Sequence, residues 1–155
     1  MTIKHIKANA VTYTLEDDSR ILIHVCNDVK IMGSGIAREI RNRVPSAYTN
    51  YTRSACRLGN VTYSDDYKIA NMVSQHEYNG YKGNYRRGHR FLNYAALNEC
   101  LNEISSYFYL QDSGITEVVL PFKMGADRAG GDWEIVMELV EWQLGGVFDI
   151  TICEI

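Results

Sequence analysis

Two glycine-rich segments hold the residues whose types and spacing could do chemistry. The first is Met32-Gly33-Ser34-Gly35-Ile36-Ala37, and the second is Met124-Gly125-Ala126-Asp127-Arg128-Ala129-Gly130-Gly131-Asp132-Trp133. Glycine has no Cβ, so its backbone can approach an anion closely and adopt positive φ. Successive free N–H groups at the start of a helix can donate to phosphate oxygens. A helical pattern follows each segment, and the pair therefore predicts a site for a diphosphate.

The spacing of these glycines excludes the fingerprints of two common nucleotide-binding classes. Gly33-Ser34-Gly35 is followed by Ile36-Ala37-Arg38, so the GxGxxG pattern of dinucleotide-binding proteins is not met. The sequence also lacks the GxxxxGK(S/T) pattern of P-loop NTPases. A Rossmann dehydrogenase and a P-loop NTPase are therefore disfavoured.

Several polar side chains near the first glycine segment could orient a ligand or transfer a proton. Asn27 and Asp28 follow an apolar run, and His24 lies inside that run between Ile23 and Val25. Asn27 could instead form a turn after the strand, and His24 could be a hydrogen-bonded core histidine. Asp28 could be an exposed loop residue, and His76 is a further candidate for proton transfer.

Charged side chains lie in the second glycine segment and in a basic run that precedes it, and each has two possible roles. Asp127 places a carboxylate beside the predicted diphosphate, and it could equally be an exposed loop residue. Arg128 could offset the repulsion from Asp127 or contact a phosphate directly. The run Arg86-Arg87-Gly88-His89-Arg90 could reach an added phosphate or be a solvated loop. Asp132 is expected to cap the following helix, with Trp133 buried below it.

Apolar runs and helical patterns alternate along the chain, which predicts a mostly parallel sheet covered by helices. We expect strands at residues 20–26, 67–74, 116–121 and 148–153, with edge strands near 3–6 and 11–15. We expect helices at residues 35–44, 45–57, 93–110 and 132–144. Residues 75–90 form a long irregular segment, which is typical of a functional or mobile loop.

Composition and charge favour a small ligand. The 155 residues have 46% hydrophobic and 23% charged side chains, as expected of an ordered globular domain, and a formal charge of −3. A nucleic-acid-binding protein usually has a basic excess, so the charge argues against that class, although Tyr78, Tyr81 and Tyr85 beside basic residues could stack bases.

No apolar run reaches the length of a membrane helix, and we expect a cytoplasmic protein. The four cysteines are scattered, which predicts buried thiols, and we expect no metal and no cofactor.

The sequence resembles the macrodomain family, in particular its small stand-alone branch that includes ADP-ribose-1″-phosphate phosphatases. The most specific matches are Arg20-Ile21-Leu22-Ile23-His24-Val25-Cys26-Asn27, then Gly33-Ser34-Gly35-Ile36-Ala37, and Gly130-Gly131-Asp132-Trp133-Glu134. The resemblance covers nearly the whole chain. It implies an α/β, macrodomain-like three-layer α/β/α fold with a mixed, mostly parallel central sheet, and a single macrodomain over residues 1–155.

The same resemblance implies how ADP-ribose is held. The adenine lies near Asn9, Asn27 bonds the distal ribose hydroxyls, and the two glycine segments cover the diphosphate from opposite sides. The expected ligand-binding residues are Asn9, Ala10, Asn27, Met32, Gly33, Ser34, Gly35, Ile36, Lys123, Met124, Gly125, Ala126, Asp127, Arg128, Ala129 and Gly130. Many macrodomains have an aspartate at the position of Asn9, so weaker adenine selection is expected here.

The resemblance also separates several functions. One macrodomain branch removes ADP-ribose from protein carboxylates with a lysine and an aspartate. The position that matches the lysine is Gln75 or His76 here, and the position that matches the aspartate is Ala129. Neither group is present, so this mechanism is disfavoured. We therefore expect hydrolysis of ADP-ribose-1″-phosphate, with Asn27, His24 and Asp28 as the candidate catalytic residues. The alternatives are a non-catalytic module that binds ADP-ribose or ADP-ribosylated macromolecules, and a hydrolase of ADP-ribosyl adducts without a Lys/Asp pair.

Overall fold

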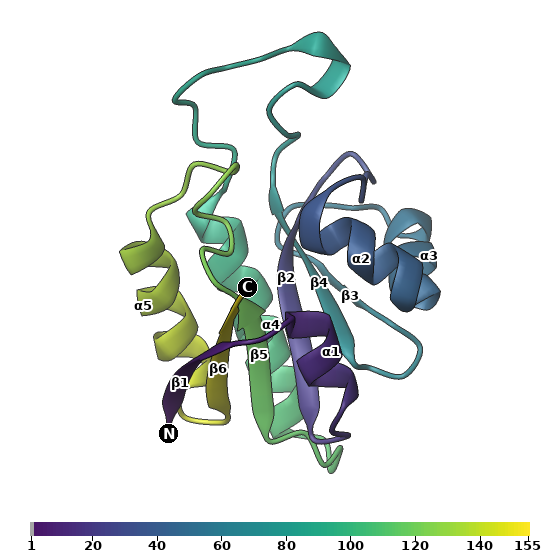
Figure 1. The fold of residues 1–155 in the computed structure, drawn as a ribbon, viewed down its shortest axis with the longest axis vertical. Coiled ribbons are helices and arrows are strands. Elements are labelled where there is room, and N and C mark those ends of the chain that lie inside the picture. Colours follow the sequence, from purple (N-terminus) through teal and green to yellow (C-terminus); the bar gives the residue numbers. More distant parts are fainter. Residues whose placement is uncertain (1) are drawn as a thin grey trace.

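A computed structural model describes residues 2–155 as a six-stranded sheet between two layers of helices (Figure 1). The strands are β1 (Ile3–Lys7), β2 (Arg20–Asn27), β3 (Val61–Tyr63), β4 (Ile69–Gln75), β5 (Glu117–Pro121) and β6 (Asp149–Glu154). The helices are α1 (Ala10–Leu15), α2 (Gly35–Arg43), α3 (Pro45–Arg53), α4 (Tyr94–Tyr109) and α5 (Trp133–Leu144), with a short 3₁₀ turn η1 (Tyr81–Gly83). None of the helices within residues 2–155 combines the length and apolarity needed to cross a membrane.

The strand order is β1-β6-β5-β2-β4-β3, and neighbouring strands are parallel except for the antiparallel pair of β3 and β4. The predicted three-layer α/β/α fold with a mixed, mostly parallel sheet is confirmed. Because the first five strands in this order run in one direction, their carboxyl ends meet at one edge of the sheet. Loops that begin at this edge are placed to form a ligand site.

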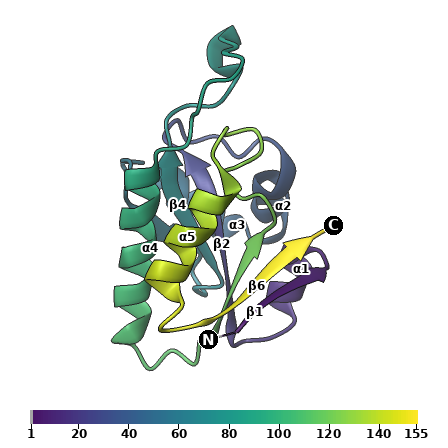
Figure 2. The ribbon, with the colours of Figure 1, turned by 90° about the vertical axis from the view of Figure 1, so that its left-hand side faces the viewer.

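Alternation of apolar side chains along the central strands fills two cores. Ile21 and Ile23 of β2 belong to the core beneath α4 and α5, and Leu22 belongs to the core beneath α1 and α2. Figure 2 shows α4 and α5 together on one face of the sheet. A strand covered on both faces favours apolar residues at consecutive positions, which is why Ile21, Leu22 and Ile23 lack the usual polar alternation.

The two central strands β2 and β5 separate toward their carboxyl ends. Their pairing covers Arg20–Leu22 of β2 and Glu117–Val119 of β5. Beyond Leu22, β2 continues beside β4, while β5 continues beside β6. The loops that follow β2 and β5 therefore start from adjacent strands that have already diverged.

One predicted edge strand is wrong: residues 11–15 belong to helix α1. The Asn9 side chain caps this helix, with its Oδ1 accepting from the Thr12 N–H at 2.9 Å. Ala10, Val11 and Thr14 are its buried residues, which is helical spacing. The β-branched composition of the segment suggested a strand, but the cap and the buried face decide for a helix.

Two smaller differences concern the segment after α3. This helix ends at Arg53, four residues earlier than predicted, because Ser54 is extended and its hydroxyl donates to the Tyr51 carbonyl at 2.7 Å. Strand β3 was not predicted, since three residues are too few to give a periodic pattern. The other predicted strands and helices lie within two residues of their observed bounds.

His24 occupies the buried middle of β2 and is 1% exposed. Its Nε2 lies 2.7 Å from Asn71 Oδ1, and the Asn71 amide nitrogen donates to the Ala47 carbonyl at 3.0 Å. That second bond fixes the orientation of the Asn71 amide, so His24 Nε2–H is the donor. Burial lowers the pKa of His24 from 6.5 to about 4.

Protonation of His24 predicts acid-sensitive stability. Between pH 6.5 and about 4 the unfolded chain takes up a proton at His24 that the folded chain does not. The free energy of unfolding should therefore be highest above pH 6.5 and fall toward pH 4, by about 3 kcal/mol for this group. Urea unfolding from pH 4 to 7.5 should show a smaller decrease in His24→Gln than in the wild type. Equal decreases in both proteins would contradict this role.

Candidate functional site

Both glycine segments lie at the carboxyl edge of the sheet, one after β2 and the other after β5. They approach each other closely: Arg128 Nη1 of the second segment donates to Ser34 Oγ of the first at 3.2 Å. We call the surface between them the cradle, formed by residues 33–37 and 125–130. The two segments, about ninety residues apart in the sequence, are thus brought together as predicted.

The cradle is rich in backbone N–H groups that the protein leaves unpaired. Among residues 2–155, no protein acceptor bonds the N–H groups of residues 33–37. The same holds for Gly125, Asp127, Arg128 and Ala129 on the other side. The first N–H groups of a helix have no partner within the helix, and successive free N–H groups can bind an anion, so donors that gather at one edge indicate a candidate anion site.

Asn27 shapes the first segment. Its Oδ1 accepts from Val29 N at 3.1 Å and Ile31 N at 3.3 Å, and its Nδ2 donates to Ile31 O at 2.9 Å. The Tyr51 hydroxyl is shared between the Asn27 carbonyl oxygen at 2.5 Å and Oδ1 at 2.8 Å. Tyr51 is fully buried, and burial raises its pKa far above the usual value, so the phenol remains a donor. Asn27 therefore forms the turn after β2, and one hydrogen of its amide remains for a ligand.

The second segment needs glycine at three positions. Gly125 and Gly130 have φ of 72° and 75°, which side chains rarely adopt. A Cβ on Gly130 would lie 2.7 Å from the His89 carbonyl oxygen, and one on Gly131 would lie 2.5 Å from the Gly125 carbonyl oxygen. The backbone of the segment is therefore packed tightly, against itself at Gly131 and against His89 at Gly130.

Asp28 and His76 form a pair beside Asn27, at the ends of the neighbouring strands β2 and β4. His76 Nδ1 lies 2.7 Å from Asp28 Oδ2, and Asp28 Oδ1 accepts from the Glu77 N–H at 2.8 Å. The hydrogen bond to Asp28 raises the pKa of His76. The His76 side chain is 65% exposed, and its Nε2 lies 3.8 Å from Glu77 Oε1. Of the predicted proton-transfer groups, these two act as a unit, and the buried His24 lies apart from them.

At the predicted adenine end of the site, the Asn9 side chain is engaged in hydrogen bonds within the protein. Asn9 uses its amide oxygen to cap α1, and its Nδ2 donates to both carboxylate oxygens of Glu39 at 3.0 and 2.9 Å. Glu39 is half-buried on α2, one turn after the cradle. Sequence reasoning did not find Glu39, because nothing in its spacing links it to Asn9.

The remaining predicted ligand residues divide by exposure. Met32, Met124, Ala129 and Ala10 are buried, so they present backbone rather than side chain to a ligand. The exposed members are Gly33, Ser34, Gly35, Lys123, Asp127, Arg128 and Gly130, and the half-buried ones are Ile36, Gly125 and Ala126. In the described part of the chain, no three His, Cys, Asp or Glu side chains gather as a metal site requires.

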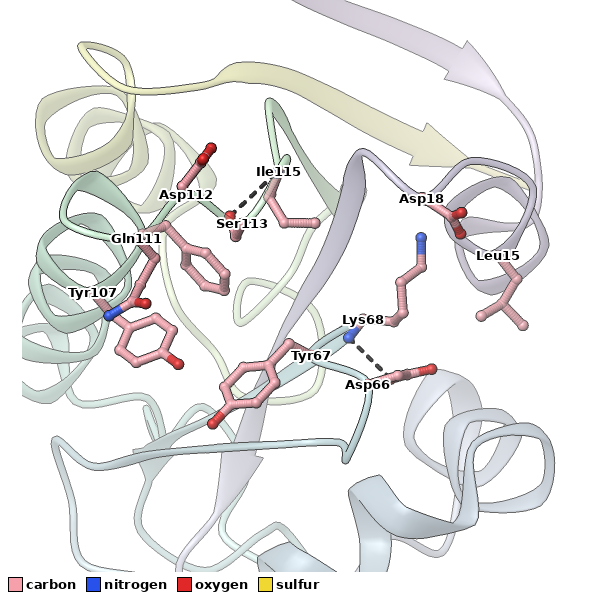
Figure 3. Close-up of a pocket in the computed structure, with 11 residues that line it drawn as sticks. Leu15, Asp18, Asp66, Tyr67, Lys68, Tyr107, Gln111, Asp112, Ser113 and Ile115 are labelled. Atoms are coloured by element: carbon pink, nitrogen blue, oxygen red, sulfur yellow. Dashed lines mark hydrogen bonds between the residues drawn. The ribbon is translucent and has the colours of Figure 1, made fainter.

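A separate cavity of about 490 Å³ opens at the opposite edge of the sheet (Figure 3). Lys68 points into it, and Tyr67, Tyr107, Asp18, Asp66 and Asp112 are among its lining residues. No residue of the cradle lines this cavity. Lys68 Nζ donates to the Asp17 carbonyl, which explains its place inside the fold.

Comparison with known proteins relates the fold to solved structures. No protein-family model matches the sequence, and no curated protein matches it significantly. A Bacteroides thetaiotaomicron protein of unknown function is 25% identical with a TM-score of 0.80, covering 100% of this chain and 99% of the other. The Streptomyces coelicolor macrodomain protein is 23% identical with a TM-score of 0.72, covering 97% of each chain. DarTG from Thermosipho africanus, solved in complex with ADP-ribose, is 15% identical with a TM-score of 0.70, covering 100% of this chain and 42% of that one.

These likenesses, together with the strand order and the two edge loops, show that the chain has the macrodomain fold. The resemblance noted from the sequence is confirmed at the level of the fold.

The tight fold of the second segment predicts that an alanine at Gly131 destabilises the protein, whereas an alanine at Gly146 does not. Gly131→Ala forces a methyl group against the Gly125 carbonyl, so it should lower the free energy of unfolding by about 1–3 kcal/mol. Gly146→Ala, in a turn with no atom within 4 Å of the added Cβ, should change it by less than about 0.5 kcal/mol. Urea unfolding of both variants measures the difference, and equal stabilities would refute the packing described for Gly131.

Proposed function

We propose that this protein binds ADP-ribose, with the diphosphate in the cradle. The observation that carries the proposal is the set of N–H groups without a protein acceptor in two glycine segments that the bond from Arg128 to Ser34 brings together. A diphosphate has two linked groups of oxygen acceptors, so it can accept hydrogen bonds from donors on both sides of the cradle. The complex of ADP-ribose with the structural neighbour DarTG supports the choice of ligand.

Charged side chains at the rim fit an anion held mainly by backbone. Arg128 bridges the two segments in the absence of ligand, and Lys123 is exposed beside it. Asp127 lies next to Arg128 and lowers the local positive charge, so the backbone donors dominate the attraction. We assign Arg128 to a direct contact with a phosphate oxygen, exchanging its bond with Ser34 for a charge-assisted one.

The two ends of the ligand fall at polar groups on either side of the cradle. The free amide hydrogen of Asn27 would donate to a hydroxyl of the distal ribose. At the adenine end, the Asn9 oxygen is used by the helix cap, so Glu39 supplies the acceptor for the adenine amine. Glu39 thereby takes the role expected of the aspartate that this chain lacks at position 9.

Gly33 offers a direct test of ligand binding. A Cβ at Gly33 meets only Ile31 Cγ2, at 3.5 Å, so the fold itself tolerates a side chain there. Gly33→Glu should keep the wild-type free energy of unfolding within about 0.5 kcal/mol. It should abolish binding of ADP-ribose in titration calorimetry, because it places a carboxylate in the cradle.

The control for this experiment is Gly146→Glu, which adds the same charge in a distant turn. It should bind ADP-ribose as the wild type does. A wild-type protein that shows no heat of binding with ADP-ribose would refute the proposed function, as would a Gly33→Glu variant that binds normally.

We further propose that the protein hydrolyses ADP-ribose-1″-phosphate, and that His76 and Asp28 transfer the proton. With Asn27 at the distal ribose, the adjacent His76 lies on the side of the 1″ carbon. Water would attack phosphorus, the bond between phosphorus and the 1″ oxygen would break, and His76 Nε2 would protonate the leaving oxygen. The attacking water would lose its proton to solvent or to the released phosphate.

Asp28 prepares His76 for this role. It holds Nδ1 and keeps the imidazolium populated to a higher pH than in a free histidine, because the pKa of His76 is raised. The backbone bond from Glu77 fixes Asp28 in turn. The orientation and protonation state of His76 are thus set by hydrogen bonds that run from Glu77 N–H through Asp28. No further group is needed to protonate the leaving oxygen.

The pair predicts a defined pH dependence. Because His76 acts as an acid, kcat/KM should fall as pH rises through its raised pKa. Asp28→Asn removes the largest cause of that raised value, so the falling limb should move to lower pH. His76→Gln should lower phosphate release by about a hundredfold while ADP-ribose binding is kept.

Release of inorganic phosphate from ADP-ribose-1″-phosphate measures these rates. An unchanged pH profile in Asp28→Asn would contradict the role of the pair. A wild-type protein that binds ADP-ribose but releases no phosphate above buffer would leave the non-catalytic binding module as its function.

A further inference from the structure

Residues 76–91 form an arm that extends beyond the carboxyl edge of the sheet, away from both helix layers (Figure 1). We call it the basic arm. It contains four Lys or Arg side chains and one acidic side chain, Glu77, for a formal charge of +3. The rest of the chain has twelve basic and eighteen acidic residues and a formal charge of −6. The net charge of the whole chain is therefore negative even though this segment is strongly positive.

The tip of the basic arm has a defined structure. Gly80 N donates to the Asn84 carbonyl at 2.7 Å, and Asn84 N donates to the Tyr81 carbonyl at 3.0 Å. The Asn79 side chain accepts from Arg86 N at 2.7 Å and closes the turn. These bonds hold the backbone of the tip in place from Asn79 to Arg86.

Tyr85 presents an aromatic ring to solvent. It is 80% exposed, and its ring rests against the backbone of Gly80, where an added Cβ would lie 2.8 Å from Tyr85 Cε1. Gly80 has a φ of 99°, which favours glycine there. Behind it, Tyr78 and Tyr81 pack edge to face at 5.4 Å and support the tip. Tyr85 is therefore a solvent-exposed aromatic surface on which a base could stack.

The root of the basic arm adjoins the cradle. Phe91 N donates to the Ala129 carbonyl at 2.8 Å, and His76 N donates to the Phe91 carbonyl at 3.1 Å. The Arg90 guanidinium lies over the Tyr94 ring at 4.1 Å, next to the start of α4. A long ligand bound along the basic arm would therefore extend past the cradle.

We propose that the basic arm binds single-stranded nucleic acid. A base stacks on Tyr85, and the flanking phosphates contact Lys82, Arg86 and Arg87. Single strands expose base faces that a duplex hides, and stacking accepts every base because each has a π face. The negative remainder of the molecule repels the strand elsewhere, which confines binding to the arm. The proposal uses no residue of the cradle and is independent of ADP-ribose binding.

Fluorescence anisotropy with labelled 20-nucleotide DNA and RNA single strands, and with the corresponding duplex, tests the proposal. Wild-type protein should bind at least one kind of single strand more tightly than the duplex. Tyr85→Ala should weaken that binding about tenfold. The double variant R86A/R87A should make the slope of log affinity against log salt shallower by about 1.4, or 0.7 for each lost phosphate contact.

A matched control removes two exposed arginines outside the arm, in R53A/R57A. It should leave both affinity and salt slope unchanged. Equal binding by the wild type and the arm variants would overturn the proposal, as would preference for the duplex or absence of binding. Binding of the arm to vesicles containing anionic lipid, with no affinity for oligonucleotides, would assign the arm to a membrane surface instead.

Titration of the same variants with ADP-ribose separates the two proposals. Arm variants that lose the oligonucleotide and keep ADP-ribose support this inference. Loss of ADP-ribose binding in the wild type would refute the function proposed for the cradle and leave the result for the oligonucleotide to stand by itself.

Discussion

The separation of β2 from β5 is the constraint on which the functional part of this protein depends. The two central strands share a ladder only as far as Leu22 and Val119. Past that point each follows its other neighbour, so the loops that continue them are not joined by strand pairing. Several of their backbone N–H groups have no protein acceptor, and an anion can supply one. A continuous ladder would have paired these strands to their ends.

The loops keep this open shape because other groups hold them from behind. Asn27 accepts three hydrogen bonds at one oxygen atom, and the buried Tyr51 supplies one of them. On the other side, Gly125, Gly130 and Gly131 allow the chain to double back within van der Waals distance of itself. Removing a partner from such a network costs about 1–3 kcal/mol, because the remaining groups lose their hydrogen bonds. Binding donors are thus fixed in place before any ligand arrives, which lowers the entropy cost of binding.

Much of this arrangement could be predicted from the sequence. The continuous apolar run of β2 indicated a strand covered on both faces, and the glycine segments indicated its ligand edge. Helix α1 was mistaken for a strand, because the cap made by Asn9 outweighs the β-branched composition of Val11 to Leu15. Contacts between distant residues could not be predicted at all. The bonds of His76 to Asp28, Asn9 to Glu39 and Arg128 to Ser34 depend on the strand order, and no local pattern encodes them.

Net charge was also a poor guide to where charge lies. The formal charge of −3 argued against a polyanionic partner, yet the basic residues of the arm are gathered beside the cradle. The most direct measurement of the central claim is a crystal structure of the protein with ADP-ribose. We expect the diphosphate within hydrogen-bond distance of the N–H groups of residues 33–37 and 125–129, with the distal ribose at Asn27. An ADP-ribose found in the cavity beside Lys68, or a cradle that stays empty at saturating ligand, would contradict the account.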